Sequence, residues 1–193
     1  MAKRKYEFRP DKLGPDIFSK LYLTPKQRHT LLRWILHAVV LVVLSVIQDV
    51  IMSRIHIFRA TTDLVPCAII LLCILLGADR ASVFSLIAAM LYKFSGTAPG
   101  HYVIALIPIF GLTAAVLRKN LFRKSIAADI LCAGVAVVGY EISLFGVGLL
   151  FHYTIASYGP RFFLTALYSL VFCFVLYPIF TAIEKIGGEP WKE

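Results

Sequence analysis

The sequence holds few residues that could do chemistry, and Glu141 is the most informative of them. It lies within a mainly apolar stretch that runs from about 127 to 151. Counted from Ile130, it lies roughly 16 Å along that stretch, near the middle of a hydrocarbon core about 30 Å thick. A carboxylate at that depth costs about 2.5–3.5 kcal/mol on insertion scales, so it normally faces a bundle interior or a partner. We therefore expect Glu141 to serve function or partner contact, or to be a structural acid that is either protonated or internally hydrogen-bonded.

A second set of polar residues lies near the end of the first apolar stretch. Gln48 and Asp49 are next to each other there, and Lys93 closes the third stretch on the same predicted side of the membrane. An Asp49–Lys93 ion pair would satisfy both charges within the outer third of the membrane. The alternative, which we favour, is that each side chain reaches the interface separately.

The sequence contains no recognisable catalytic or metal-binding motif. The cysteines lie singly in apolar stretches without C-x-x-C spacing, at Cys67, Cys73, Cys132 and Cys173. Four histidines, His37, His56, His101 and His152, also lack metal-ligand spacing. A Walker A loop, a nucleophile elbow, an H-E-x-x-H pair and a dinucleotide-binding turn are all absent. The sequence therefore predicts a protein that is not an enzyme, with no catalytic residue, cofactor or metal.

The elements that must position these residues are membrane helices. Of the 193 residues, 59% are hydrophobic and 16% are charged, and the mean hydropathy is +0.79. A soluble domain usually has about 45–50% apolar residues. The apolar residues also lie in long, almost uncharged stretches, which excludes a disordered chain and an exposed amphipathic module. We expect an integral membrane protein.

Six stretches are candidate transmembrane helices, since a helix needs about 20 mostly apolar residues to cross a bilayer. They run over about 31–52, 63–78, 81–94, 101–117, 127–151 and 161–183. The second and third are short and flank a turn at residues 77–80, so a re-entrant hairpin is an alternative to the two tilted spans that we favour. The predicted fold is an all-α, polytopic membrane helix bundle with about six transmembrane helices.

Basic residues predict the orientation of this bundle. The chain has a net charge of +9, and with six spans sixteen Lys and Arg residues fall in cytoplasmic segments and four in outer segments. This bias predicts that both chain ends are cytoplasmic. The predicted regions are a basic tail over 1–30, a transmembrane domain over 31–184 and a short tail over 185–193. We expect the excess of basic residues to bind anionic lipids of the inner leaflet, and not nucleic acid.

Small residues recur at four-residue spacing in two of the predicted helices. They are Ala81, Ser85 and Ala89 in the third stretch, and Gly111 and Ala115 in the fourth. Such faces let helix backbones approach closely in lipid. We expect them to pack helices together, either within the chain or against a partner.

The layout from about residue 36 to 122 resembles the rod shape-determining protein MreD family. The residues that carry the resemblance are Ile47-Gln48 at the end of the first span, Asp63-Leu64-Val65-Pro66 at the start of the second, Gly77, Gly96, Pro99-Gly100, and the basic end at 117–122. Two positions depart from the family pattern. Cys67 follows Pro66 where the family often has Asp, and Tyr92 stands where the family often has an acid.

The resemblance implies a non-enzymatic scaffold of the bacterial cell-elongation complex, located in the cytoplasmic membrane and involved in cell shape and peptidoglycan synthesis. Its implied partners are MreC-like and other rod-complex membrane proteins, and the MreB filament at the cytoplasmic face. The same six-helix layout occurs in substrate-binding components of energy-coupling-factor transporters, so a vitamin or micronutrient transporter component is the alternative. Such a component would need an outward pocket lined by residues such as Asp49, Lys93 and Glu141. A third hypothesis, with less support in the sequence, is a membrane enzyme that uses Glu141 as an acid or base.

Overall fold

The computed structural model describes residues 25–55, 60–96, 98–121 and 125–186, and these form an all-α bundle. Its six α-helices are α1 (Pro25–Ile47), α2 (Leu64–Leu76), α3 (Ala78–Phe94), α4 (Val103–Leu121), α5 (Ile126–Leu150) and α6 (Gly159–Lys185). A π-helical turn, Gln48–Met52, extends α1, and a short 3-10 turn, Ala156–Tyr158, precedes α6. Most of the two predicted tails and His56 lie outside the described residues.

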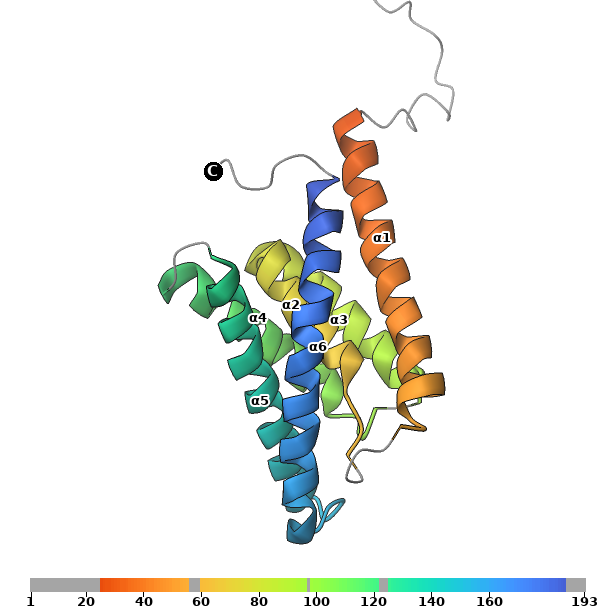
Figure 1. Ribbon diagram of the computed structural model, residues 1–193, viewed down its shortest axis with the longest axis vertical. Coiled ribbons are helices and arrows are strands. Elements are labelled where there is room, and N and C mark those ends of the chain that lie inside the picture. The colour runs from red at the N-terminus through yellow and green to blue at the C-terminus, as the bar shows by residue number, and fades with distance from the viewer. Residues whose placement is uncertain (1–24, 56–59, 97, 122–124, 187–193) are drawn as a thin grey trace, which may run out of the picture.

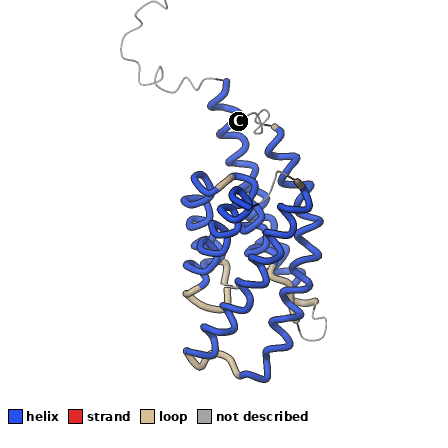
Figure 2. Tube along the Cα trace, turned by 90° about the vertical axis from the view of Figure 1, so that its left-hand side faces the viewer, coloured by secondary structure: helices blue, strands red, loops and turns tan. Residues whose placement is uncertain are grey.

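Successive helices run in alternating directions, so the first turn of α1 and the last turn of α6 lie at the same end of the bundle (Figure 1). We call the end that holds Pro25 and Lys185 the terminal end. The opposite end, which holds the π-helical turn, residues 60–63 and the connection from α5 to α6, is the distal end. In the view turned by 90°, the described chain again consists of helices joined by loops (Figure 2).

Four helical segments are long and apolar enough to cross a membrane. They are Arg28–Met52, Val103–Leu121, Ile126–Leu150 and Ala156–Lys185. The prediction of an all-α bundle that contains helices long and apolar enough to cross a membrane is confirmed. The helices extend beyond the predicted limits where polar residues continue the helical backbone, as in the turn that begins at Pro25 and in the basic end of α4.

Helix α2 lies in the centre of the bundle. All residues from Leu64 to Leu75 are buried, and α2 packs against α1, α3, α4, α5 and α6. Its sequence explains this position, because a helix that is apolar on every side is covered on every side. With 13 residues, α2 is only about 20 Å long, which is shorter than a hydrocarbon core of about 30 Å.

A single glycine joins α2 to α3. Gly77 has φ +79° and ψ 158°, and Ala78 already begins the next helix. Only glycine adopts this backbone conformation readily, so Gly77 makes the tight turn possible. The second and third predicted segments therefore form a helical hairpin of 13 and 17 residues. That both cross the membrane stays a prediction.

The small-residue faces lie inside the bundle. Ala81, Ser85 and Ala89 have no exposed surface, and α3 packs against α2 and α4. A Cβ atom at Gly111 would lie 2.7 Å from the sulfur of Cys73, so α4 approaches α2 too closely there for any larger residue without a shift. Ala115 is buried as well. These faces are consequently occupied by the chain's own helices.

Three further residues singled out in the sequence lie at helix ends or in the connections between helices. Pro66 lies in the first turn of α2, where its missing N–H costs no helical hydrogen bond. Gly96 follows α3 with φ +89°, a conformation that favours glycine. At Gly100, a Cβ atom would overlap the ring of Tyr102, which shows how tightly this loop passes the start of α4.

Candidate functional site

Gln48 connects three helices at the distal end. Its Nε2 donates hydrogen bonds to the hydroxyl of Tyr92 at 3.1 Å and to Oδ1 of Asp63 at 3.4 Å. Its Oε1 accepts a hydrogen bond from the backbone N–H of Val65 at 2.9 Å. The first N–H groups of a helix have no partner within that helix, so Gln48 caps α2 from outside. The predicted intramembrane polar residue Gln48 is therefore a buried link between α1, α2 and α3.

The start of α2 is also attached to α6. The backbone N–H of Asp63 donates to Oγ of Ser169 at 3.2 Å, and the thiol of Cys67 donates to the backbone carbonyl of Ser169 at 3.4 Å. Ser169 has no exposed surface. These bonds hold the backbone of Asp63, the residue just before α2, against α6.

Asp63 and Glu141 line one cavity of about 380 Å³ at the distal end, which we call the distal cavity. Its other lining residues come from the loops before α2, α4 and α6, and from α5 and α6: Ala60, Thr61, Pro99, Leu144, Tyr153, Thr154, Tyr158, Arg161, Phe162 and Thr165. Residues that are 78 positions apart in the sequence thus place two carboxyl groups in the same space.

Glu141 is 2% exposed, and neither of its carboxyl oxygens has a hydrogen-bond partner among the described residues. The internally hydrogen-bonded acid that we considered from the sequence is therefore not observed. A buried polar group without a partner is costly, and almost all such groups in folded proteins are paired. A positively charged group that entered the cavity could pair with the Glu141 carboxyl group and so stabilise it.

Arg161 supplies the cationic group in the lining of the distal cavity. Its guanidinium carbon lies 4.5 Å from the ring centre of Tyr158, a cation–π contact, and it forms no ion pair within the described part of the chain. The cavity therefore contains two acidic groups, one guanidinium group and the aromatic rings of Tyr153, Tyr158 and Phe162.

Asp49 and Lys93 lie outside this cavity. No ion pair joins them within the described residues, so the Asp49–Lys93 pair considered from the sequence is wrong. One carboxyl oxygen of Asp49 is buried without a hydrogen bond, while Lys93 is half-buried near the end of α3. Of the residues proposed for an outward pocket, only Glu141 lines the distal cavity.

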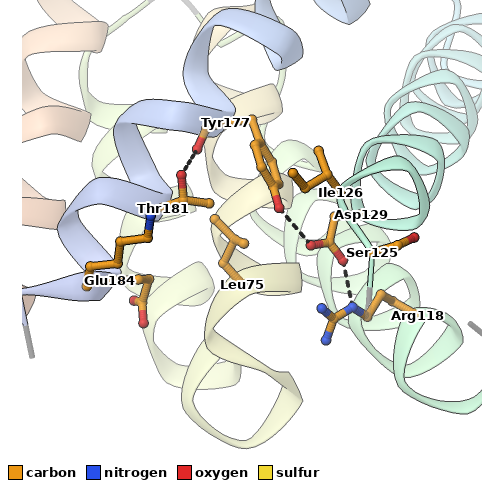
Figure 3. Close-up of a pocket in the computed structure, with 9 residues that line it drawn as sticks. Leu75, Arg118, Ser125, Ile126, Asp129, Tyr177, Thr181 and Glu184 are labelled. Carbon is orange, nitrogen blue, oxygen red and sulfur yellow. Dashed lines mark hydrogen bonds and ion pairs between the residues drawn. The ribbon is translucent and has the colours of Figure 1, made fainter. Parts of the chain in front are cut away.

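A second cavity, also of about 380 Å³, lies at the terminal end (Figure 3). Asp129 is its polar centre, because Nε of Arg118 lies 2.6 Å from Oδ1 and the hydroxyl of Tyr177 donates to Oδ2 at 3.1 Å. Leu75, at the end of α2, and Glu184, on α6, also line this space. The carboxylate here is paired, in contrast to Glu141.

Glu184 belongs to a buried cluster that attaches α1 to α6. Arg33 Nη1 lies 3.1 Å from Glu184 Oε2, and His37 Nε2 lies 3.5 Å from Glu184 Oε1. His37 stacks on the ring of Phe180 at a centroid distance of 6.1 Å and meets Phe84 edge-on at 6.5 Å. The ion pair and the aromatic contacts fix α1 at the terminal end, as Gln48 does at the distal end.

Neither cluster at the terminal end, the one around Asp129 or the one around Glu184, was predicted from the sequence. Asp129 was a usable signal, since an acid inside an apolar stretch usually has an interior partner. Arg33 lies near the start of the first apolar stretch, and Glu184 lies next to the last residue of α6, positions for which the simplest expectation is contact with water or headgroups. Their pairing depends on how α1 packs against α6, which helical spacing alone does not reveal.

Within the described part of the chain, no three His, Cys, Asp or Glu residues gather in a way that could hold a metal ion. The distal cavity has charged groups and aromatic rings that could bind a ligand. The Asp129 and Glu184 clusters at the terminal end attach helices to one another. No protein-family model, curated protein or solved structure matches this chain.

Proposed function

We propose that the protein is a non-enzymatic integral membrane scaffold of the bacterial cell-elongation complex. It would act in cell shape and peptidoglycan synthesis, from the cytoplasmic membrane. The observation that carries this proposal is the junction at Gln48. Gln48, Asp63 and Val65 carry much of the resemblance to the MreD family. Hydrogen bonds join Gln48, at the end of the first span, to Asp63 and Val65, at the start of the second. The family-like residues thus have a common structural task, which is to fix the first helix against the buried second one.

The way α1 is attached supports a docking role. Polar contacts hold it near both ends, at Arg33 and at Gln48. Between them, an apolar groove of about 110 Å³ lies between α1 and α3, lined by residues that include Val42, Phe84 and Leu91. Polar residues and close packing are the means by which helices associate in lipid. We propose that the surface around this groove receives the transmembrane helix of an MreC-like partner.

The distribution of charge supports a cytoplasmic terminal end. Among side chains that the structure describes, six basic residues lie toward the terminal end, namely Arg28, Arg33, Arg80, Arg118, Lys119 and Lys185. Three lie toward the distal end, namely Arg54, Lys93 and Arg161. Basic residues favour the cytoplasmic side of membrane proteins. Under this proposal both chain ends are cytoplasmic, near anionic lipids and the MreB filament.

Depletion and crosslinking in the native cell test the scaffold. Depletion should round the cells, and the purified protein should carry an MreC-like partner with it. A photo-crosslinking residue at Val42, in the groove, should capture that partner, whereas the same residue at Val171, exposed on α6, should not. Normal cell shape after depletion, together with no elongation protein in the purified sample, would contradict the proposal.

The distal cavity favours a second candidate, a substrate-binding component of an energy-coupling-factor transporter. Its unpaired Glu141 faces a space large enough for a small molecule. This candidate requires association with a membrane coupling subunit and a pair of ATPases. Purification from native membranes separates the two functions, because it should recover the ATPases in one case and the elongation proteins in the other.

A further inference from the structure

The distal cavity has the charge pattern of a binding site. We propose that it binds a small zwitterion, with the ammonium group at Asp63 and Glu141 and the anionic group at Arg161. This inference concerns the cavity itself and holds whether the protein joins the elongation complex or a transporter.

Glu141 provides the strongest reason for a ligand. Its side chain is 2% exposed, it lines the cavity, and both of its oxygens lack a hydrogen-bond partner in the described structure. Asp63, which also lines the cavity, uses one oxygen for a long hydrogen bond of 3.4 Å from Gln48. An ammonium group has three N–H donors and a positive charge, which match these unfilled acceptors.

The charges are arranged along the axis of the bundle. Glu141 lies nine residues before Leu150, the last residue of α5, which is about 13 Å deeper than the helix end. Arg161, in contrast, lies two residues after Gly159, at the first turn of α6. The acidic group is thus toward the interior and the guanidinium toward the loops. A zwitterion that enters with its ammonium group first would meet both charges in the right order.

The lining favours an organic ion over a metal ion. Two carboxylates give fewer protein ligands than hard cations such as Ca²⁺ usually take, and the Arg161 guanidinium beside them would repel a metal ion. The rings of Tyr153, Tyr158 and Phe162 also line the cavity. Aromatic faces attract organic ammonium groups. An ammonium group joined to a phosphate or carboxylate by a short chain satisfies all of these features.

This chemistry has two sources, a free molecule and a lipid headgroup. Phosphoethanolamine represents the first and phosphatidylethanolamine the second, and both carry a primary ammonium next to a phosphate. Because the cavity lies at the end of the bundle and is lined by loop residues, either source has a route to it. The test therefore uses both probes.

In the first arm, isothermal titration measures O-phosphoethanolamine binding to the full-length protein in phosphatidylcholine nanodiscs. Ethyl phosphate, which lacks the ammonium group, is the matched probe. In the second arm, native mass spectrometry measures which lipid the protein retains from discs with equal phosphatidylethanolamine and phosphatidylcholine. Each arm compares the wild type with Glu141→Gln and Arg161→Ala, and with Asp49→Asn, an acid outside the cavity.

We expect binding in at least one arm, and a loss of about tenfold or more in Glu141→Gln and Arg161→Ala, because each variant removes a charge-assisted contact. Asp49→Asn should bind as the wild type does. If Glu141→Gln does not fold, Arg161→Ala at the cavity rim decides. The proposal is overturned if neither probe binds, if Arg161→Ala binds as tightly as the wild type, or if ethyl phosphate binds as tightly as O-phosphoethanolamine. Recovery of elongation proteins or ATPases is a separate measurement, so this result does not depend on the scaffold proposal.

Discussion

Arg33 and Glu184, 151 residues apart in the sequence, form a buried ion pair at 3.1 Å that joins the first helix to the last. Both side chains are more than nine-tenths buried, with 7% and 6% exposure. Removing one partner of such a pair leaves an uncompensated buried charge and typically costs about 3–5 kcal/mol.

Arg33→Ala is therefore expected to lower the free energy of unfolding by several kcal/mol, because Glu184 loses its cationic partner. Thermal unfolding in detergent, followed by intrinsic fluorescence, measures the change. Arg28→Ala is the matched control, since Arg28 is exposed on the same helix and should have little effect. Equal midpoints for the two variants would show that the ion pair does not stabilise the bundle.

Gln48→Leu should loosen the distal junction, because it removes the acceptor for the Val65 N–H and the donor to Tyr92. A hydrogen bond of this kind contributes about 1 kcal/mol, and a buried group left without a partner costs about 1–3 kcal/mol. Hydrogen exchange should become faster in the first turn of α2. Val46→Ala, on the exposed side of α1, should leave that exchange unchanged. Unaltered protection in Gln48→Leu would contradict the capping role.

Gly77→Ala should destabilise the hairpin of α2 and α3. The backbone at φ +79° and ψ 158° is open almost only to glycine, and forcing another residue into it costs of order 1–3 kcal/mol. Gly146→Ala is the control, because Gly146 lies in α5 and an added Cβ there would meet no atom within 4 Å. Unfolding midpoints should fall for the first variant and stay level or rise for the second. A larger fall for Gly146→Ala would contradict the strained turn.

Cysteine labelling tests the predicted orientation. The four native cysteines are buried, so background labelling should be low. With both chain ends cytoplasmic, Ser157→Cys at the distal end should react with an impermeant maleimide added outside intact cells. Asn120→Cys at the terminal end should react only after the membrane is opened. The reverse pattern would invert the orientation and exclude cytoplasmic tails.

Sequence reasoning predicted the parts of the fold that depend on local composition. Continuous apolar stretches identified the helices. The isolated acid Glu141 was expected to face either the bundle interior or a partner, and it is buried within the bundle. Long-range partners were harder to predict. Gln48 and Tyr92 are 44 residues apart, and their contact depends on the relative placement of the end of α1 and α3. The distal cavity was missed for the same reason, since Asp63 and Arg161 belong to segments whose relative placement is set by packing.

The brevity of α2 explains why the bundle is hollow at both ends. Asp63, just before its first residue, lines one hollow, and Leu75, one residue before its last, lines the other. The central helix α2 has only 13 residues, whereas α5 and α6, which pack around it, have 25 and 27 residues. It is therefore too short to fill the interior of the bundle along its whole length. The positions of the two ends of α2 therefore help to set the depth of each cavity, and an extra helical turn at one end of α2 would occupy part of the adjacent cavity and displace the residue that lines it.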